Sequence, residues 1–161
     1  MANVSIKGVD RLTQRFNKIA NMELREAMNK ATQLVHGQAK ALAPADTGQL
    51  RGSIHMQVKD KGKEIEGRVY TNVEYAPYVE FGTGIKGNGT YPYTIEGLTL
   101  EYKNKGWAYY DEDKGEWIYT KGQKAQPYMY PALKQNEKAI NKILKEGVHT
   151  KLKENSKGGQ N

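Results

Sequence analysis

The chain has 161 residues, a hydrophobic share of 37%, a formal net charge of +7 and no cysteine. Its length suits one folded domain with a core of its own, and the lack of cysteine excludes disulfides, thiol catalysis and cysteine metal sites. The mean hydropathy of -0.82 is polar for a compact monomer and leaves room for burial against neighbouring chains. No apolar run is long enough to span a bilayer and no signal-peptide pattern is present, so we expect an intracellular protein without a membrane partner.

The positive charge is compatible with nucleic-acid binding. The lysines are spread along the chain among Glu and Asp residues, with some excess towards the C-terminus. Such mixed charge is ordinary on solvated helix and loop surfaces, which is the simpler interpretation. A basic nucleic-acid-binding module therefore stays open as an alternative function.

The first part of the chain predicts helix. Residues 8–20 carry apolar side chains at helical spacing, and residues 23–43 carry a longer apolar stripe with the same period. Asn21 is a candidate interruption between the two. Pro44 disfavours helical dihedral angles at Ala43, so we expect the helix to end there.

The stretch 43–54, APADTGQLRGSI, predicts the corner at which the chain turns from helix to strand. Asp46 and Thr47 are suited to bond nearby backbone amides through their side chains, and Gly48 tolerates a positive φ. Arg51 places a planar, permanently charged guanidinium just beyond the turn. We assign these residues to holding the corner and not to catalysis.

After the corner the apolar period changes to two, which predicts strands. Ile54, Met56 and Val58 alternate with polar residues, residues 60–62 predict a turn, and a second strand follows from Ile65. The expected outcome is a β-hairpin with one apolar face.

Residues 73–84, VEYAPYVEFGTG, predict a short helical turn that is ended by glycines. Glu80 is the odd residue in this turn because apolar residues stand on both sides of it. We expect it to pair with Arg51 or Arg68, or to face water. Catalysis by Glu80 is disfavoured because no partner acid, base or metal cluster accompanies it.

Residues 85–123 form a glycine-punctuated aromatic stretch, and its core, GWAYYDEDKGEWIY, predicts a second hairpin with its turn at 111–115. Few aliphatic residues support it, so it either lies on the main body or meets another chain. If the protein bound nucleic acid, these aromatic side chains could stack on bases. The acidic residues in the turn of the hairpin disfavour its approach to phosphates. We favour a subunit interface. The candidate interface residues are Tyr102, Trp107, Tyr109, Tyr110, Trp117 and Tyr119.

The last part, residues 122–144, predicts a loop that leads into a C-terminal helix with Pro131 in its first turn. Residues 156–161 are expected to form a flexible tail. Together the segments predict a single α+β domain over 1–155. Its parts are a long N-terminal helical segment, a small mostly antiparallel sheet, an aromatic β-hairpin insertion and a C-terminal helix.

Motifs that carry enzyme chemistry are missing from the sequence. The glycine-rich run 82–90 lacks the Gly-Lys-Ser/Thr ending of a phosphate loop and leads into a Tyr/Pro segment. No nucleophile elbow, dinucleotide fingerprint or closely paired histidines occur. We therefore assign no catalytic, cofactor-binding or metal-binding residue, and a small enzyme is the least supported class.

Three motifs in order resemble a family of tailed-bacteriophage structural proteins, the minor head–tail joining or tail-completion proteins of the siphophage-type neck. They are the corner, YAPYVEFGT and QPYMYPAL, each weak alone and fairly specific in this order. The matching positions are Ala43, Pro44, Asp46, Thr47, Gly48, Leu50, Arg51, Ser53, Ile54, Tyr75, Ala76, Val79, Glu80, Phe81, Gly82, Thr83, Gln126, Pro127, Tyr128, Pro131, Ala132 and Leu133.

The resemblance implies a non-enzymatic virion assembly protein, encoded by a phage or prophage, that joins head and tail in an oligomeric ring. The implied partners are a connector, a tail terminator or a tail tube protein. The implied location is the neck or tail of the virion, with the host cytoplasm during assembly. It leaves open a monomer in isolation and a transient contact with packaged DNA. A closed ring needs two different contacting patches, and an aromatic arm that meets a neighbouring body is one such arrangement.

Overall fold

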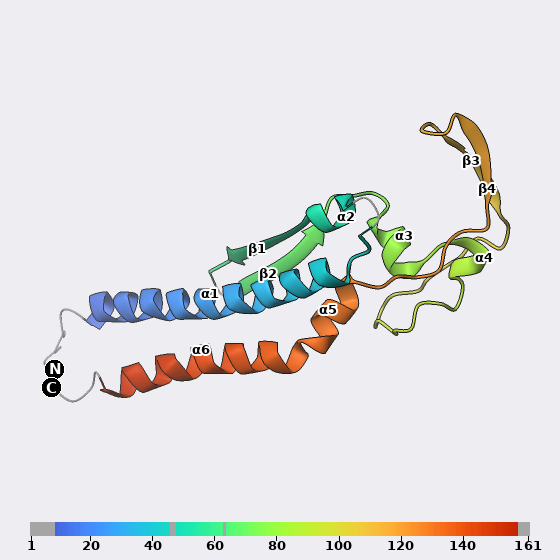
Figure 1. Ribbon diagram of the computed structural model, residues 1–161. Coiled ribbons are helices and arrows are strands. Elements are labelled where there is room, and N and C mark those ends of the chain that lie inside the picture. Colours follow the sequence, from blue (N-terminus) through green and yellow to red (C-terminus); the bar gives the residue numbers. More distant parts are fainter. Residues whose placement is uncertain (1–8, 46–47, 63, 158–161) are drawn as a thin grey trace, which may run out of the picture. The chain divides into compact units, whose positions relative to one another are not determined.

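The computed structural model describes residues 9–45, 48–62 and 64–157, and within these ranges the side chains of residues 22–149. It has the α+β composition that the sequence predicts, with two small two-stranded sheets between helical segments (Figure 1). In chain order the elements are α1 (Val9–Leu42), α2 (Gln49–Gly52), β1 (Ile54–Asp60), β2 (Ile65–Thr71), α3 (Ala76–Phe81), α4 (Gly84–Gly87), β3 (Trp107–Asp111), β4 (Glu116–Thr120), α5 (Met129–Gln135) and α6 (Glu137–Lys157).

Helix α1 is continuous, so the interruption predicted at Asn21 is wrong. Asparagine costs a helix only a fraction of a kcal/mol, about 0.7 at most, and the packing of a long apolar face outweighs that cost. The predicted end is confirmed, because the helix stops at Leu42 and the amide of Ala43 closes its last turn on the Ala39 carbonyl at 2.9 Å.

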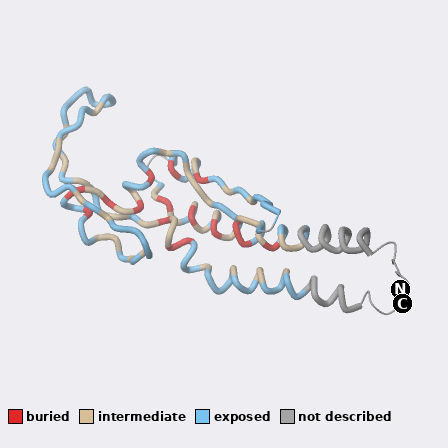
Figure 2. Tube along the Cα trace, turned by 180° about the vertical axis from the view of Figure 1, so that it is seen from behind, coloured by how far each residue is buried: buried red, intermediate tan, exposed pale blue. Residues whose placement is uncertain are grey.

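Small side chains at intervals of four residues form the buried face of α1. Ala27, Ala31, Val35 and Ala39 are each at most 8% exposed, and the buried positions recur along the helix in Figure 2. A stripe of small residues at this spacing lets neighbouring segments approach the helix backbone closely.

The chain forms two compact units. The first takes residues up to 35, residues 56–69 and residues from 136 onwards, and the second takes residues 36–55 and 70–135. Helix α1 and the hairpin β1–β2 each contribute to both units.

In the first unit α1 is contacted by the β1–β2 hairpin and by α6, which runs antiparallel to it (Figure 1). A Cβ placed on Gly67 of β2 would meet Thr32 Oγ1 and, at 2.9 Å, Met28 Sδ. A Cβ placed on Gly147 of α6 would meet the Ala27 Cβ at 2.6 Å. Glycine is therefore the residue that permits each of these two contacts.

The sequence predicts one C-terminal helix, but the chain breaks it in two at Asn136. The Asn136 carbonyl accepts the amide of Ile140 at 2.8 Å, so Asn136 stands at the N-cap of α6, a position that asparagine favours. Helix α6 runs to Lys157, past the start of the predicted tail, and residues 158–161 lie outside the described residues.

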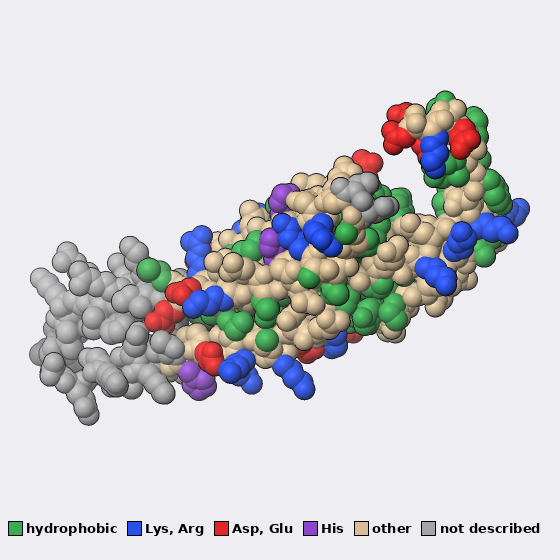
Figure 3. Space-filling view, viewed as in Figure 1, with side chains coloured by type: hydrophobic (Ala, Val, Ile, Leu, Met, Phe, Trp, Pro, Cys, Tyr) green, Lys and Arg blue, Asp and Glu red, His purple; other side chains and the backbone are tan. Residues whose placement is uncertain are grey.

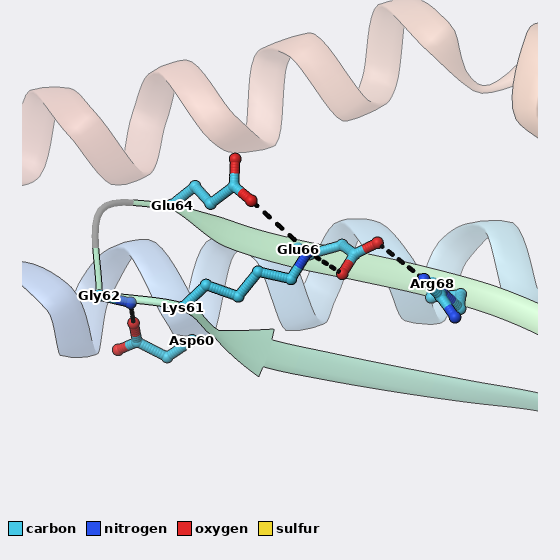
Figure 4. Close-up of polar contacts among 6 residues, drawn as sticks. All are labelled: Asp60, Lys61, Gly62, Glu64, Glu66 and Arg68. Carbon is cyan, nitrogen blue, oxygen red and sulfur yellow. Dashed lines mark hydrogen bonds and ion pairs between the residues drawn. The ribbon is translucent and has the colours of Figure 1, made fainter.

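The β1–β2 turn is stabilised by local polar contacts (Figure 4). Asp60 Oδ1 accepts the amide of Gly62 at 2.8 Å, as the predicted turn requires. Glu66 joins Lys61 at 2.8 Å and Arg68 at 3.1 Å, and the hydrogen bond from Lys61 is the main reason that its pKa lies below the ordinary value. These side chains are solvated, so the contacts serve to set the turn more than to stabilise the fold.

Within the described ranges no helix combines the length and the apolar character needed to cross a membrane.

Replacing Gly67 by alanine tests the close packing of β2 on α1. The added methyl group would clash with Thr32 and Met28, so we expect a loss of about 1–3 kcal/mol in unfolding free energy. Gly52→Ala is the matched control, because nothing lies within 4 Å of a Cβ at that position. Urea unfolding of both variants is the measurement, and equal midpoints would contradict the packing described here.

Candidate functional site

The corner is a compact turn in the second unit, and it includes a short helix, α2, that the sequence does not predict. Gly48 precedes α2 with φ of +72°, the left-handed conformation expected for it. Leu50 of α2 and Ile54 at the start of β1 are 4% and 1% exposed, so the corner has a small core of its own.

Polar contacts connect the two ends of the corner. Arg51 Nη2 donates to the Ala43 carbonyl at 3.1 Å, and so bonds the end of α1. Ser53 Oγ lies 2.7 Å from both the Leu50 carbonyl and Thr71 Oγ1. Of the residues assigned to this turn, Asp46 and Thr47 lie outside the described residues.

Glu80 is buried and binds backbone amides, so the predicted pairing with Arg51 or Arg68 and the predicted exposure to water are both wrong. Its side chain is 5% exposed. Oε2 accepts the amides of Tyr128 and Met129 at 2.7 and 2.8 Å, and Oε1 accepts that of Tyr130 at 3.1 Å. These amides belong to the residue before α5 and to its first two residues, so they lack partners within the helix and favour a negative charge. The carboxylate therefore caps α5 from a distance of about 50 residues along the chain.

Aromatic residues surround this carboxylate. The rings of Phe81, Tyr91, Tyr93 and Tyr130 form a chain of contacts with centroids 5.0–5.6 Å apart. Burial, and then the charge of Glu80, raises the pKa of Tyr128 to about 12 and raises that of Tyr91 still further. Burial and the neighbouring carboxylate both disfavour the charged form of these phenols.

The glycine-rich run at residues 82–90, for which the sequence disfavours phosphate binding, packs closely against another part of the backbone. The backbones of Thr83 and Gln123 exchange two hydrogen bonds, of 2.9 and 3.1 Å, and the Gln123 side chain donates to the Tyr78 carbonyl at 2.9 Å. Gly122 has φ of +90°, and a Cβ there would overlap the Thr83 carbonyl. The chain that returns from the hairpin thus lies directly on the end of α3.

The aromatic hairpin has two different faces. Strands β3 and β4 are antiparallel, with Trp107 opposite Thr120, Tyr109 opposite Ile118 and Tyr110 opposite Trp117. Since side chains alternate between the faces of a strand, one face carries Trp107, Tyr109 and Ile118. The other face, named here the outer face, carries Tyr110, Trp117 and Tyr119.

A groove of about 1080 Å³ opens between the hairpin and the body of the second unit. Leu50 of the corner and Tyr78 of α3 line it on one side, and Tyr102, Trp107 and Tyr109 of the insertion line it on the other. The Tyr102 hydroxyl is fixed by a 2.9 Å hydrogen bond to the Phe81 carbonyl, and Lys103 Nζ lies 5.0 Å from the centre of the Trp107 ring. Figure 3 shows green hydrophobic side chains along the hairpin.

The groove suits binding of a protein surface. Its walls are aromatic and apolar with hydroxyl groups at intervals, which is the composition of interface cores. Across the described residues no group of three or more His, Cys, Asp or Glu side chains is placed to hold a metal ion.

Comparison with known families gives a match to the N-terminal part of the chain. Residues 6–82 match the family model described as "Bacteriophage HK97-gp10, putative tail-component". This segment is HK97-gp10-like. Over these residues the family match confirms the resemblance to phage structural proteins, and it supports a structural role as a tail component. No curated protein and no solved structure matches the chain.

The HK97-gp10-like segment contains two of the three predicted markers, the corner and the α3 stretch as far as Gly82. The third marker, QPYMYPAL, begins at Gln126 and lies beyond the match, but Glu80 binds its backbone. The interface residues predicted from the aromatic insertion also lie beyond the match. The structure divides them between the groove and the outer face of the hairpin, and their role stays a prediction.

Gly48→Val tests the left-handed turn at the corner. Nothing lies within 4 Å of a Cβ at Gly48, so the whole cost is conformational, and we expect a loss of about 1–2 kcal/mol. Gly48→Asn is the control, because asparagine enters the left-handed region far more readily. Thermal unfolding that gives the same midpoint for Val, Asn and the original glycine would refute the assignment.

Glu80→Gln tests the long-range cap. The amide keeps the size of the side chain but removes its charge and turns a donor towards backbone donors, so we expect a loss of about 3 kcal/mol. Glu74→Gln, at an exposed position in the same stretch, is the matched control and is expected to change the midpoint of urea unfolding little. If the two variants unfold alike, Glu80 does not stabilise the fold in this way.

Proposed function

We propose that the protein is a non-enzymatic virion assembly protein of the phage neck, which joins head and tail as part of an oligomeric ring. The match of residues 6–82 to a phage tail-component family carries this proposal. The connector, tail terminator and tail tube proteins are the partners that we propose.

The aromatic groove and the hairpin give the proposal a physical basis. A ring subunit needs one surface for each neighbour, and those two surfaces must differ. The second unit has a concave surface, the groove, and a projecting one, the outer face of the hairpin. Trp117 and Tyr119 on the outer face are 72% and 65% exposed, which is unusual for aromatic side chains in a protein that acts alone.

The net charge of +7 supports one competing function, DNA binding. Helix α6 exposes Lys138, Lys142 and Lys145 to solvent, although Lys142 lies 3.9 Å from Glu146. A DNA-binding module would bind duplex DNA with an affinity that falls steeply with salt, with a slope set by the number of phosphates contacted. A neck protein that lets the genome pass has no need of such tight binding.

Assembly with neck and tail components is the direct test. We expect the purified protein to co-purify with a connector, tail terminator or tail tube protein expressed from the neighbouring genes. Light scattering and negative-stain imaging are expected to show rings, either alone or with that partner. A strict monomer that binds none of these components, or one whose sole activity is salt-dependent DNA binding, would contradict the proposal.

A further inference from the structure

The outer face of the hairpin is an apolar surface that nothing in the described part of the chain covers. Tyr110, Trp117 and Tyr119 are 50%, 72% and 65% exposed, and Tyr110 and Trp117 contact each other edge to face at 5.7 Å. Tyr110 and Trp117 thus already form an ordered aromatic pair. Its exposure indicates that a partner surface completes its burial.

The tip of the hairpin is acidic. Asp111 is occupied within the turn, because Oδ1 accepts the amides of Asp113 and Lys114 and Oδ2 lies 3.5 Å from Lys114 Nζ. Glu112, Asp113 and Glu116 are exposed, and none of them makes an ion pair in the described part of the chain. These three carboxylates are named here the tip. Figure 3 shows red acidic side chains at the end of the hairpin.

Basic residues are close in sequence to residues that line the groove. Lys86, Lys121 and Lys124 are exposed and are one or two residues from the groove-lining Gly84, Gly122 and Gln123. The amide of Lys86 donates to the Lys121 carbonyl at 3.1 Å, so two of these lysines come from adjacent backbones. Within the described ranges none of the three forms an ion pair. These lysines, named here the rim, outnumber the one acidic residue that lines the groove, Glu101.

We propose that the hairpin of one copy docks in the groove of the next copy, with the tip carboxylates against the rim lysines. The charges are complementary between the tip and the rim and repulsive between two tips or two rims, which selects a head-to-tail contact over a symmetric one. The outer aromatic face then meets the aromatic walls of the neighbouring groove. Because the two patches differ, the contact is heterologous, and it builds a ring when the rotation from one copy to the next closes. This inference rests on the proposed ring function and names the contact that builds it.

Charge exchange between tip and rim is the test. The tip variant combines Glu112→Lys and Asp113→Lys, and the rim variant combines Lys121→Glu and Lys124→Glu. Self-association of the full chain at low salt is measured by sedimentation velocity. Each variant alone sets like charges against each other, so we expect its association to weaken by about tenfold or more. A mixture of the two is expected to recover association as a one-to-one, alternating oligomer, because both kinds of contact are then attractive again.

The control is Lys138→Glu with Lys145→Glu, an equal charge change on exposed residues of α6, which is expected to leave association unchanged. Circular dichroism and thermal unfolding establish that every variant is folded. The docking is overturned if the tip and rim variants associate as the original chain does, or if the mixture recovers nothing. It is also overturned if the original chain stays monomeric at high concentration and low salt.

The outcome separates this inference from the proposed function. A chain that stays monomeric but binds a neck or tail component overturns the docking and leaves the proposed function in place. A chain that does neither overturns both. A ring that persists in the tip and rim variants supports the proposed function and shows that another surface builds it.

Discussion

The second unit depends on one buried carboxylate. Glu80 lies on the short helix α3, and its two oxygens accept three successive amides at the start of α5. Hydrogen bonds to a charged acceptor are among the strongest in a protein, and their loss leaves buried amides unpaired. The interaction also connects the two ends of the aromatic insertion, because α3 precedes that insertion and α5 follows it. The contact therefore fixes the positions at which the chain enters and leaves the insertion.

This contact explains why the insertion tolerates an unusual composition. The stretch from 85 to 123 has few aliphatic residues and cannot build much core alone. It is held instead by backbone pairing between Thr83 and Gln123 and by the hydrogen bond from Tyr102 to the Phe81 carbonyl. Main-chain contacts thus fix the start and the end of the insertion. The side chains of the hairpin are not needed to hold it in place and are available for an interface. The hairpin therefore keeps exposed aromatic residues at little cost to the fold.

The sequence predicts the elements well wherever side-chain periodicity decides the structure. The long apolar stripe before Ala43, the alternation from Ile54 and the aromatic pattern around residues 107–120 each give the observed helix or strands. Side-chain periodicity does not indicate the break at Asn136 or the continuity of α1 at Asn21. The same residue type caps one helix and lies inside another, and the surrounding packing makes the difference.

The site was harder to predict than the elements, for a physical reason. Glu80 binds backbone amides, which every residue except proline has, so no partner residue marks the contact in the sequence. Arginine was the natural expectation because side-chain charges are visible in a sequence and amide groups are not. The glycines at 82, 84 and 122 did not indicate their role either, since glycine-rich runs occur both in phosphate loops and in closely packed backbones. An acidic residue between apolar neighbours was the available signal, and by itself it did not distinguish burial from exposure.

The two faces of the hairpin follow from the pairing register and not from composition. A shift of one residue in the pairing would place Tyr110 instead of Tyr109 on the same face as Ile118, so each face would carry a different set of aromatic residues. The turn at 111–115 sets the register, since Asp111 Oδ1 accepts two successive amides there. Asp111 is thus occupied within the turn that it forms, while the three tip carboxylates stay available for charge pairing. In this way a local turn determines which aromatic residues line the chain's own groove and which ones are offered to a second copy.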